Sequence, residues 1–183
     1  KIYRSIQTVI LGSSVKSWMC TGKKRNKGLM NYNDLNDQEV RELINKLKYP
    51  KNLLSFNEIH TIISSLFGKI DVDEGVIDDD DIQYILHIYR GRINHERYSI
   101  HIRFKNSHDH LVRVDINPSN RHLNPDGSII EGNHIHIYSN RYDKKDSIAI
   151  PLENSDFPNL THIVDVFSEF IKYTHIETEA DDE

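Results

Sequence analysis

Five short segments between residues 82 and 152 have strand-like sequence, and turn-forming linkers separate them. The segments cover residues 82–89, 97–104, 111–116, 133–138 and 147–152. Each is rich in β-branched and aromatic residues, whereas Gly, Pro, Asn, Asp and Ser concentrate in the linkers. One linker, "NPDG" at 124–127, is typical of a type I turn. Because short linkers join consecutive strands in opposite directions, the sequence predicts an antiparallel meander.

Amphipathic helices are expected at the two ends of this strand-rich region. Asn36 and Glu39 have the spacing of a capping box, and apolar residues then recur at helical spacing until Pro50. A second apolar stripe at helical spacing runs from Leu160 to Ile171. The predicted fold class is therefore α+β, with an antiparallel sheet of about five to six strands. An N-terminal helix and a C-terminal amphipathic helix are expected to pack on one face of that sheet.

Two segments before residue 82 are harder to assign. Residues 57–72 are rich in β-branched side chains, which favours one or two strands over a helix. The acidic stretch at 71–81 has some features of an EF-hand loop, but Ile82 stands where the closing glutamate is needed. We therefore expect an acidic hairpin loop there.

Charge divides the chain into regions. Residues 1–33 contain seven Lys or Arg and no acidic residue, and we expect a flexible or non-native basic arm. The remainder holds 16 basic and 28 acidic residues. Residues 34–176 are predicted to form a single α+β domain, and residues 177–183 an acidic disordered tail.

Cysteine usage and hydropathy indicate the compartment. The only cysteine, Cys20, leaves no intrachain disulfide, which favours a reducing environment. The one apolar run near the start, "TVIL", is too short for a membrane helix or a signal peptide. We therefore predict a cytoplasmic protein without a membrane partner. The formal net charge of −5 is no signal for nucleic acid, and nothing in the sequence indicates an oligomeric state.

Reading the strands with a period of two makes one face of the sheet aliphatic and the other unusually polar. The polar face is predicted to gather His87, Tyr89, His101, Arg103, Arg113, Asp115, His134, His136 and Tyr138. Lys and Glu, which are common on solvated strands, are absent from this set. The face is instead rich in groups that titrate near neutrality or bind phosphate.

Three interpretations fit this face. The plainest, which carries the greatest weight, is that an antiparallel sheet exposes one polar face to solvent. The second is a metal site, because His-x-His on a strand directs two imidazoles to one point and His101, His122 or Asp115 would complete it. No His-x-x-x-His or cysteine ligand pair supports that site, so neither a metal nor another cofactor is predicted.

Acid–base chemistry on RNA is the third interpretation. Metal-free RNA cleavage needs a base for the 2′-hydroxyl, an acid for the leaving 5′-oxygen and a cation for the phosphate. His134 and His136 are the predicted base and acid, and Tyr138 is an alternative proton donor. Asp115 is expected to orient a histidine, and Arg113 to hold the phosphate.

Neighbouring residues are expected to bind the substrate. Arg121 and His122 precede the "NPDG" turn and are predicted to reach over the polar face, where His101 and Arg103 also lie. Other chemistries are less favoured, since the chain has neither a Gly-rich phosphate loop nor a G-x-S-x-G elbow. Cys20 lies in the basic arm and is a poor candidate for a nucleophile.

The segment "HLVRVDINPSNRHLNPDGSIIEGNHIHIY", followed by "DSIAIPL", resembles a family of small uncharacterised proteins. They are encoded by low-GC Gram-positive bacteria, their prophages and other mobile elements. Members show a strand like "LLRLDI", a His-x-Asn-Pro-Asp-Gly turn, His-x-His-x-Tyr and a strand that ends in alanine, an aliphatic residue and proline. Here these are Leu111–Ile116, His122–Gly127, His134–Tyr138 and Ala149–Pro151, and the resemblance covers residues 34–152. The order of these elements is also loosely similar to that in TumE-type toxins, which are thought to act as RNases.

The resemblance implies an accessory protein of a phage or mobile element, and the polar face suggests action on RNA. Our hypothesis is a metal-independent, toxin-like endoribonuclease. The alternative is a non-enzymatic, anti-CRISPR-like inhibitor that binds a host defence or antitoxin protein. Acidic clusters such as Asp78–Asp81 would then mimic nucleic-acid phosphates. RNA or such a host protein is therefore the expected partner.

Overall fold

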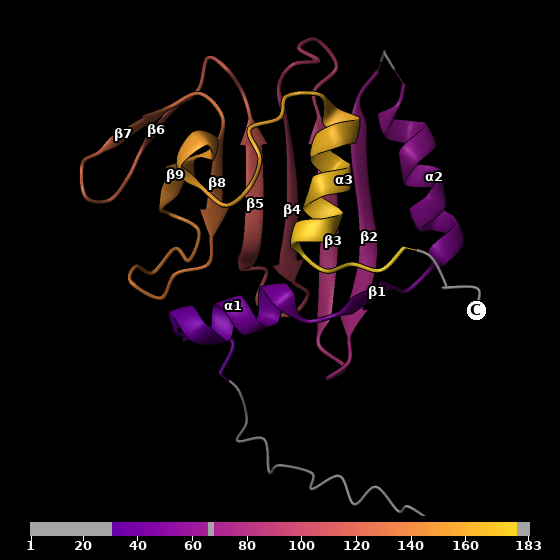
Figure 1. Ribbon diagram of the computed structural model, residues 1–183, viewed down its shortest axis with the longest axis horizontal. Helices are drawn as coiled ribbons and strands as arrows, with labels where there is room; N and C mark the ends of the chain where they lie inside the picture. Colours follow the sequence, from indigo (N-terminus) through magenta and orange to yellow (C-terminus); the bar gives the residue numbers. More distant parts are fainter. Residues whose placement is uncertain (1–30, 66–67, 179–183) are drawn as a thin grey trace, which may run out of the picture. The chain divides into compact units, whose positions relative to one another are not determined.

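The computed structural model of the chain describes residues 31–65 and 68–178. The expectations for the basic arm at 1–30 and for the end of the acidic tail at 179–183 lie outside these residues. Within them the fold is α+β, as the sequence predicts, and it is built on one long antiparallel sheet (Figure 1).

The sheet has seven strands in the order β1-β2-β3-β4-β5-β8-β9, one more than the upper expectation of six. Its strands are β1 (Lys48–Pro50), β2 (Ile70–Asp78), β3 (Gln83–Arg90), β4 (Tyr98–Phe104), β5 (His110–Ile116), β8 (His134–Ile137) and β9 (Ala149–Pro151). Every pair is antiparallel. β6 (Arg121–Leu123) and β7 (Ile129–Glu131) form a separate hairpin between β5 and β8.

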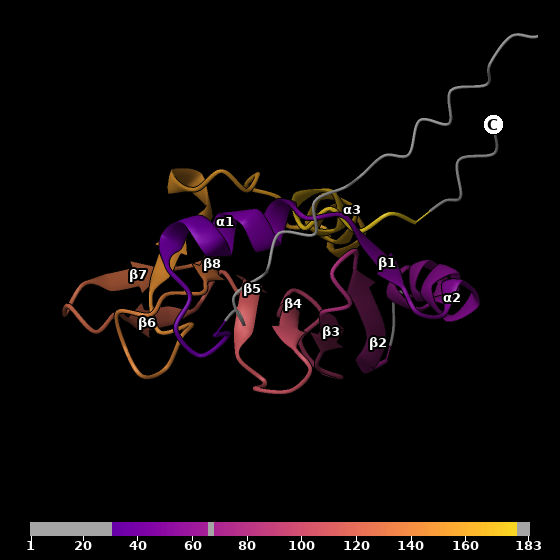
Figure 2. The ribbon, with the colours of Figure 1, turned by 90° about the horizontal axis from the view of Figure 1, so that it is seen from below.

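The described helices leave one face of the sheet open. Figure 2 shows α1 (Asp37–Asn45), α3 (Ile163–Tyr173) and the 3₁₀ helix η1 (Leu152–Asn154) above the sheet, with α2 (Leu53–Ile63) at its edge beside β2. The expected capping box begins α1, since Asn36 Oδ1 accepts from the Glu39 amide at 3.0 Å and Glu39 Oε2 accepts from the Asn36 amide at 2.9 Å. None of the described helices combines the length and the apolar character that a membrane crossing needs.

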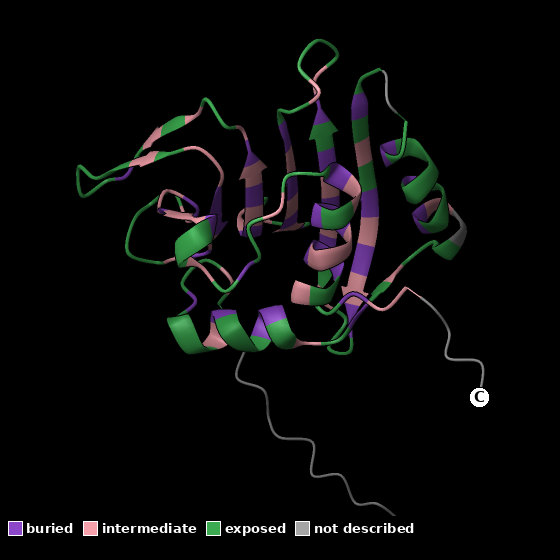
Figure 3. Cartoon of the chain, turned by 45° about the horizontal axis from the view of Figure 1, so that its top comes forward, coloured by how far each residue is buried: buried purple, intermediate pink, exposed green. Residues whose placement is uncertain are grey.

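The core lies between the helices and the aliphatic face of the sheet. Buried and less buried residues alternate along the central strands (Figure 3). The sheet contributes fully buried aliphatic side chains to this core, among them Ile100, Ile102 and Val114. Helix α3 contributes Phe167 and Phe170, which are also fully buried. Each such side chain contributes on the order of 1.5–3 kcal/mol through its burial. This packing fixes the register of the strands and so determines which residues face the open side.

The structure corrects the strand prediction for residues 57–72. Residues up to Ile63 belong to helix α2, which Asn52 caps by accepting from the Ser55 amide at 3.2 Å. Phe56, Ile59 and Ile63 are buried at helical spacing, and the Phe56 ring packs 5.9 Å from that of Phe167. Burial of this stripe outweighs the local β propensity. The acidic stretch also differs from expectation, because β2 continues to Asp78 and the turn begins only there.

A buried lysine joins the ends of two helices. Lys48 Nζ donates to the carbonyl oxygens of Leu43 at 2.7 Å, Ile44 at 3.0 Å and Lys46 at 2.7 Å, all at the end of α1. It also donates to the carbonyl of Thr174, just after α3, at 2.8 Å. These carbonyls have no partner inside their own helices, so the ammonium satisfies both helix ends at once. Burial lowers the pKa of Lys48 from 10.5 to about 8.

Candidate functional site

The open face of the sheet carries a line of polar side chains across four strands. Strand pairing places His87 opposite His101, and His101 opposite Arg113. On the next strand, Arg113 lies opposite His136 and Asp115 lies opposite His134. The period of the strands predicted that these residues share one face, but not which of them pair.

Three histidines form a row of neighbouring, mutually tilted rings in this line. The His101 ring lies 4.8 Å from that of His87 and 4.2 Å from that of His110. The outer rings each contact a carboxylate through Nδ1, at 2.7 Å: His87 with Asp73 Oδ1 and His110 with Asp146 Oδ2. We call these five residues the histidine row. A carboxylate accepts only, so each outer ring carries its proton on Nδ1 and directs Nε2 elsewhere.

The central ring of the histidine row is held neutral. Burial lowers the pKa of His101 from 6.5 to about 2, and the neighbouring charges of His110, His87, Arg103 and Arg113 add to the effect. Among the residues that the structure describes, its buried Nδ1 has no hydrogen-bond partner. His101 therefore separates the two outer histidines without exchanging protons near neutral pH.

Arg113 connects the histidine row with the next group of residues. It donates from Nε to Asp115 Oδ2 at 3.0 Å and from Nη1 to Asp146 Oδ2 at 2.5 Å. The Asp146 side chain is only 5% exposed. Burial alone would raise the pKa of Asp146, but the hydrogen bond from His110 and the charge of Arg113 outweigh burial and hold it well below its ordinary value. Asp115 and Asp146 thus stay ionised. Both bind the Arg113 guanidinium, which was predicted to hold phosphate.

A second cluster contains His122, His134 and His136, and we call it the histidine cluster. One ring nitrogen from each residue lies within 4.8 Å of the others, so the three rings can hold a metal ion. Each ring also has a nitrogen near a backbone carbonyl: His122 Nε2 at 3.0 Å from Ser147 O, His134 Nδ1 at 2.8 Å from Gly132 O, and His136 Nδ1 at 3.0 Å from Ile148 O. These carbonyls fix the orientation of all three rings.

Asp115 lies beside the histidine cluster. Its Oδ2 is 3.5 Å from Nε2 of both His134 and His136. Burial by itself would raise the pKa of Asp115, but its contacts with the two histidines and the charge of Arg113 outweigh burial and hold it far below the ordinary value. Burial also lowers the pKa of His136, which favours a neutral ring.

Burial separates the predicted catalytic pair from a macromolecular substrate. The side chains of His134 and His136 are 1% and 0% exposed, whereas those of His87 and His110 are 18% and 22% exposed. A base or acid must come within hydrogen-bond reach of the atom it serves. His87 and His110, the two outer residues of the histidine row, are therefore more accessible than the pair that the sequence singled out.

The β6–β7 hairpin carries His122 to the cluster. Gly127 N donates to Asn124 O at 2.9 Å, so the expected turn is present. The Asn124 amide then pairs with both backbone groups of Ala149 in β9: Oδ1 accepts from the amide at 2.7 Å and Nδ2 donates to the carbonyl at 3.0 Å. This side chain acts like one more peptide unit and fastens the hairpin to the edge of the sheet.

The remaining predicted site residues are Tyr138, Arg121 and Arg103, of which Arg103 lies on the open face. Tyr138 points into the helix-covered core, where its ring lies 6.3 Å from that of Phe104 and its hydroxyl donates to Tyr32 O at 3.1 Å. Strand β8 ends at Ile137, so the alternation that placed Tyr138 on the polar face no longer applies. Arg121 is exposed on the β6–β7 hairpin. Arg103 is on the open face, with Nη2 3.6 Å from Asp73 Oδ1.

Sequence reasoning missed His110, Asp73 and Asp146. The register of β4 and β5 shifts between Ile102 and Arg103, so that Arg103 pairs with His110. This irregularity reverses the alternation at the start of β5 and turns His110 to the open face. Asp73 follows the period of β2 and was overlooked because that stretch was expected to form a loop. Asp146 lies in the β8–β9 connection, where no periodic pattern applies.

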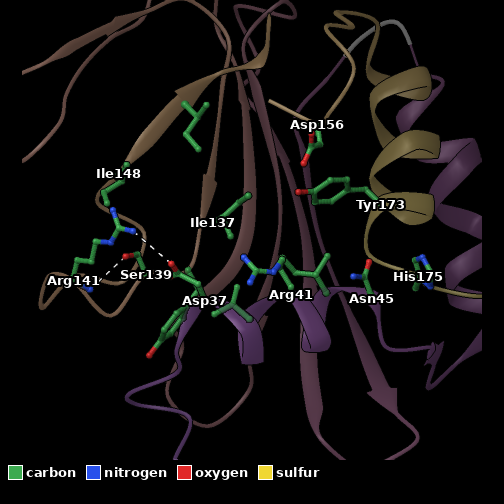
Figure 4. A pocket seen from close by; sticks show the side chains of 14 residues that line it. Asp37, Arg41, Asn45, Ile137, Ser139, Arg141, Ile148, Asp156, Tyr173 and His175 are labelled. Atoms are coloured by element: carbon green, nitrogen blue, oxygen red, sulfur yellow. Dashed lines mark hydrogen bonds and ion pairs between the residues drawn. The ribbon is translucent and has the colours of Figure 1, made fainter. Parts of the chain in front are cut away.

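One pocket lies beside the open face of the sheet, and another lies on its helix-covered side. One, of about 590 Å³, adjoins the open face; Tyr89, Ser99 and Asp115 line it together with Arg92 and Arg97 of the β3–β4 loop. The other, of about 650 Å³, lies on the helical side (Figure 4). Its walls include isoleucines of the β8–β9 region, and an ion pair between Asp37 and Arg141 at 3.5 Å lies at its edge (Figure 4).

Together the fold and the site define an antiparallel α+β domain with a histidine-rich open face. The chain belongs to the family of unknown function DUF6978, which it matches over residues 35–176. Comparison with curated proteins and with solved structures gives no significant match.

Proposed function

We propose that the protein is a metal-independent endoribonuclease that uses the histidine row. The observation that carries this proposal is the pair of carboxylate–histidine contacts, Asp73–His87 and Asp146–His110, on either side of the neutral His101. A carboxylate orients each of these two accessible imidazoles, and the His101 ring lies between them. This arrangement suits a base and an acid that act on one phosphodiester.

The proposed reaction needs no group other than these side chains. One outer histidine, in its neutral form, takes the proton of an RNA 2′-hydroxyl while the 2′-oxygen attacks phosphorus. The bond from phosphorus to the 5′-oxygen breaks, and the other outer histidine, in its protonated form, gives its proton to that oxygen. The products are a 2′,3′-cyclic phosphate and a 5′-hydroxyl. Arg103, beside Asp73, is the cation placed to stabilise the charge on the phosphate.

The adjoining 590 Å³ pocket supplies binding groups for a neighbouring nucleotide. Tyr89 follows His87 by two residues on β3 and is 42% exposed, and Lys69 Nζ lies 5.6 Å from its ring centroid, so a base would stack on the part of the ring that Lys69 leaves exposed. Arg92 and Arg97 bring positive charge to the same pocket. Stacking and phosphate contacts of this kind bind single-stranded RNA with little sequence preference.

The proposed relationship with mobile-element proteins is compatible with this activity. TumE-type toxins, to which the order of elements is loosely similar, are thought to act as RNases. A toxin of this type acts in the cytoplasm, where its RNA substrate is present. We therefore keep the cytoplasm as the proposed location of the protein.

The proposal is tested by incubating the untagged full chain with single-stranded RNA in the presence of EDTA. We expect cleavage to 2′,3′-cyclic phosphate ends, and no cleavage of an oligonucleotide whose scissile residue lacks the 2′-hydroxyl. His87→Asn and His110→Asn should each lower the rate by about 10²-fold or more. His162→Gln, at a histidine that is 69% exposed on the far side of the fold, is the matched control.

Circular dichroism and thermal unfolding would show whether each variant is folded. RNA that stays intact with the wild-type chain would refute the proposal, and so would folded His87 and His110 variants that cleave at the wild-type rate. If the chain cleaves no RNA but retains one host defence protein at a defined stoichiometry, the anti-defence inhibitor becomes the better hypothesis.

A further inference from the structure

Each ring of the histidine cluster has one nitrogen that donates to a backbone carbonyl and a second nitrogen that is left as an acceptor. A carbonyl oxygen only accepts, so the ring nitrogens that contact Ser147 O, Gly132 O and Ile148 O carry hydrogens. In neutral rings the remaining nitrogens, Nδ1 of His122 and Nε2 of His134 and His136, are therefore acceptors. Consistently, Nε2 of His134 lies 3.5 Å from the amide nitrogen of Asn120, which is a donor.

The Asp115 carboxylate faces the same lone pairs. Its Oδ2 is 3.5 Å from Nε2 of His134 and from Nε2 of His136. His136 Nε2 is also buried, and within residues 31–65 and 68–178 it has no hydrogen-bond partner. Acceptors that face one another in a buried space repel, unless a cation lies between them.

From this geometry we propose that His122, His134 and His136 bind a zinc-type divalent transition metal, with Asp115 as the fourth ligand. Imidazole and carboxylate are ligands of Zn²⁺, and the hydrogen bonds to backbone carbonyls are the outer contacts that metal-bound histidines usually make. A tetrahedral site with bonds of about 2.0–2.1 Å needs ligand atoms roughly 3.3 Å apart. One nitrogen of each ring lies within 4.8 Å of the others, so the three rings must move closer together to bind one ion, and Asp115 Oδ2, 3.5 Å from Nε2 of His134 and of His136, would complete the shell.

Such a site would be structural. Three histidines and one carboxylate fill a tetrahedral shell, and His134 and His136 are almost completely buried, so no position is open to a substrate. The ligands come from the β6–β7 hairpin and from the sheet, because His122 is on β6 while the other histidines are on β8. Bound metal would therefore fasten the hairpin to the sheet beside the contact between Asn124 and Ala149.

The test uses the untagged full chain, stripped of metal with a chelator. We expect one Zn²⁺ per chain by competition with a chromophoric chelator, and a visible Co²⁺ spectrum of tetrahedral type. Zn²⁺ at about 100 times its Kd should raise the melting temperature by roughly 5–10 °C. Mg²⁺, which prefers octahedral oxygen ligands, should have no effect.

His122→Gln is the decisive variant because its side chain is only partly buried and lies on the hairpin. It should weaken Zn²⁺ binding by about 10²-fold or more, whereas the control His162→Gln should bind like the wild type. Should His122→Gln fail to fold, Asp115→Asn provides the second test, with loss of the tetrahedral Co²⁺ spectrum as its readout. Substoichiometric Zn²⁺ in the wild-type chain, or unchanged affinity in the folded His122 variant, would overturn the proposal.

This inference is independent of the proposed RNase activity. None of its measurements contains RNA, and the RNA assay contains EDTA. Each proposal can therefore fail without affecting the result of the other.

Discussion

The His101 ring lies 4.2 Å from the His110 ring, yet in the described part of the chain only His110 of these two has a carboxylate partner. The difference comes from their positions on the sheet. His101 is in the middle of β4 and is surrounded by cationic or titratable neighbours, whereas His110 begins β5 and reaches Asp146 in the β8–β9 connection. Two adjacent histidines of one face therefore have different surroundings.

Acid should destabilise the fold through His101. Its pKa is about 2 in the folded chain against 6.5 ordinarily, so below pH 6.5 the unfolded chain binds a proton that the folded chain does not. Stability therefore falls as the pH falls, by about 1.4 kcal/mol per pH unit for one proton. We expect the unfolding free energy of the wild type to fall more steeply than that of His101→Gln between pH 6.5 and 5.

Urea unfolding at a series of pH values measures this difference. Subtracting the curve of the variant removes the other titrating groups, which both proteins share. Parallel curves for the wild type and His101→Gln would show that the imidazole is not held neutral by its surroundings.

Asp146→Asn should destabilise the fold and disturb the histidine row. Asp146 accepts from both His110 and Arg113 while it is nearly buried, and the amide would leave the guanidinium with Asp115 as its remaining ionic partner. Removal of one member of a buried ion pair costs about 3–5 kcal/mol. Denaturant unfolding should show a loss close to this range, whereas Asp143→Asn, in the exposed part of the same loop, should change stability by less than about 0.5 kcal/mol. Equal losses in the two variants would contradict this role of Asp146.

Most of the fold follows from local patterns in the sequence. Alternation in β3, β4, β5 and β8 predicted their inward residues, because a sheet with one covered face gives a clean period of two. The capping box predicted the start of α1 for the same local reason. Helix α2 was missed because its β-branched residues favour strands, and only the contact of Phe56 with Phe167, more than a hundred residues away, decides the outcome.

The candidate site was predictable only in part, because some of its residues follow the strand period and others depend on a register shift or on the path of a loop. His87, His101, Arg113 and Asp115 follow the strand period and were found. His110 required the shift in register, and Asp146 required the path of a loop, neither of which leaves a periodic signal. The burial of His134 and His136 depends on the packing of the β6–β7 hairpin, so a sequence pattern that marks them as polar does not show that they are inaccessible.

Lys48→Met should reveal how strongly the buried ammonium joins α1 to α3. Methionine has nearly the same length but donates no hydrogen bond, so the carbonyls of Leu43, Ile44, Lys46 and Thr174 lose their shared partner. We expect a loss of about 2–4 kcal/mol, measured by denaturant unfolding, because unpaired buried carbonyls cost about 1–3 kcal/mol each and relaxation recovers part of this. The control Lys51→Met removes an exposed contact with Gln83 and should cost less than about 0.5 kcal/mol. A Lys48 variant as stable as the control would mean that water satisfies these carbonyls equally well.

Asn124→Ala should release the β6–β7 hairpin from the sheet while the core remains folded. Its amide makes two hydrogen bonds to the backbone of Ala149, at 2.7 and 3.0 Å, and its side chain is buried. Truncation removes both bonds and should cost about 1–3 kcal/mol. The loss should be local, because the strands of the main sheet keep their own ladder. In hydrogen exchange, the Ala149 amide should lose protection while the amides of β3 and β4 keep theirs; Asn106→Ala, in the exposed β4–β5 turn, should leave all of them unchanged. If the Ala149 amide stays protected in Asn124→Ala, contacts other than this side chain hold the hairpin in place.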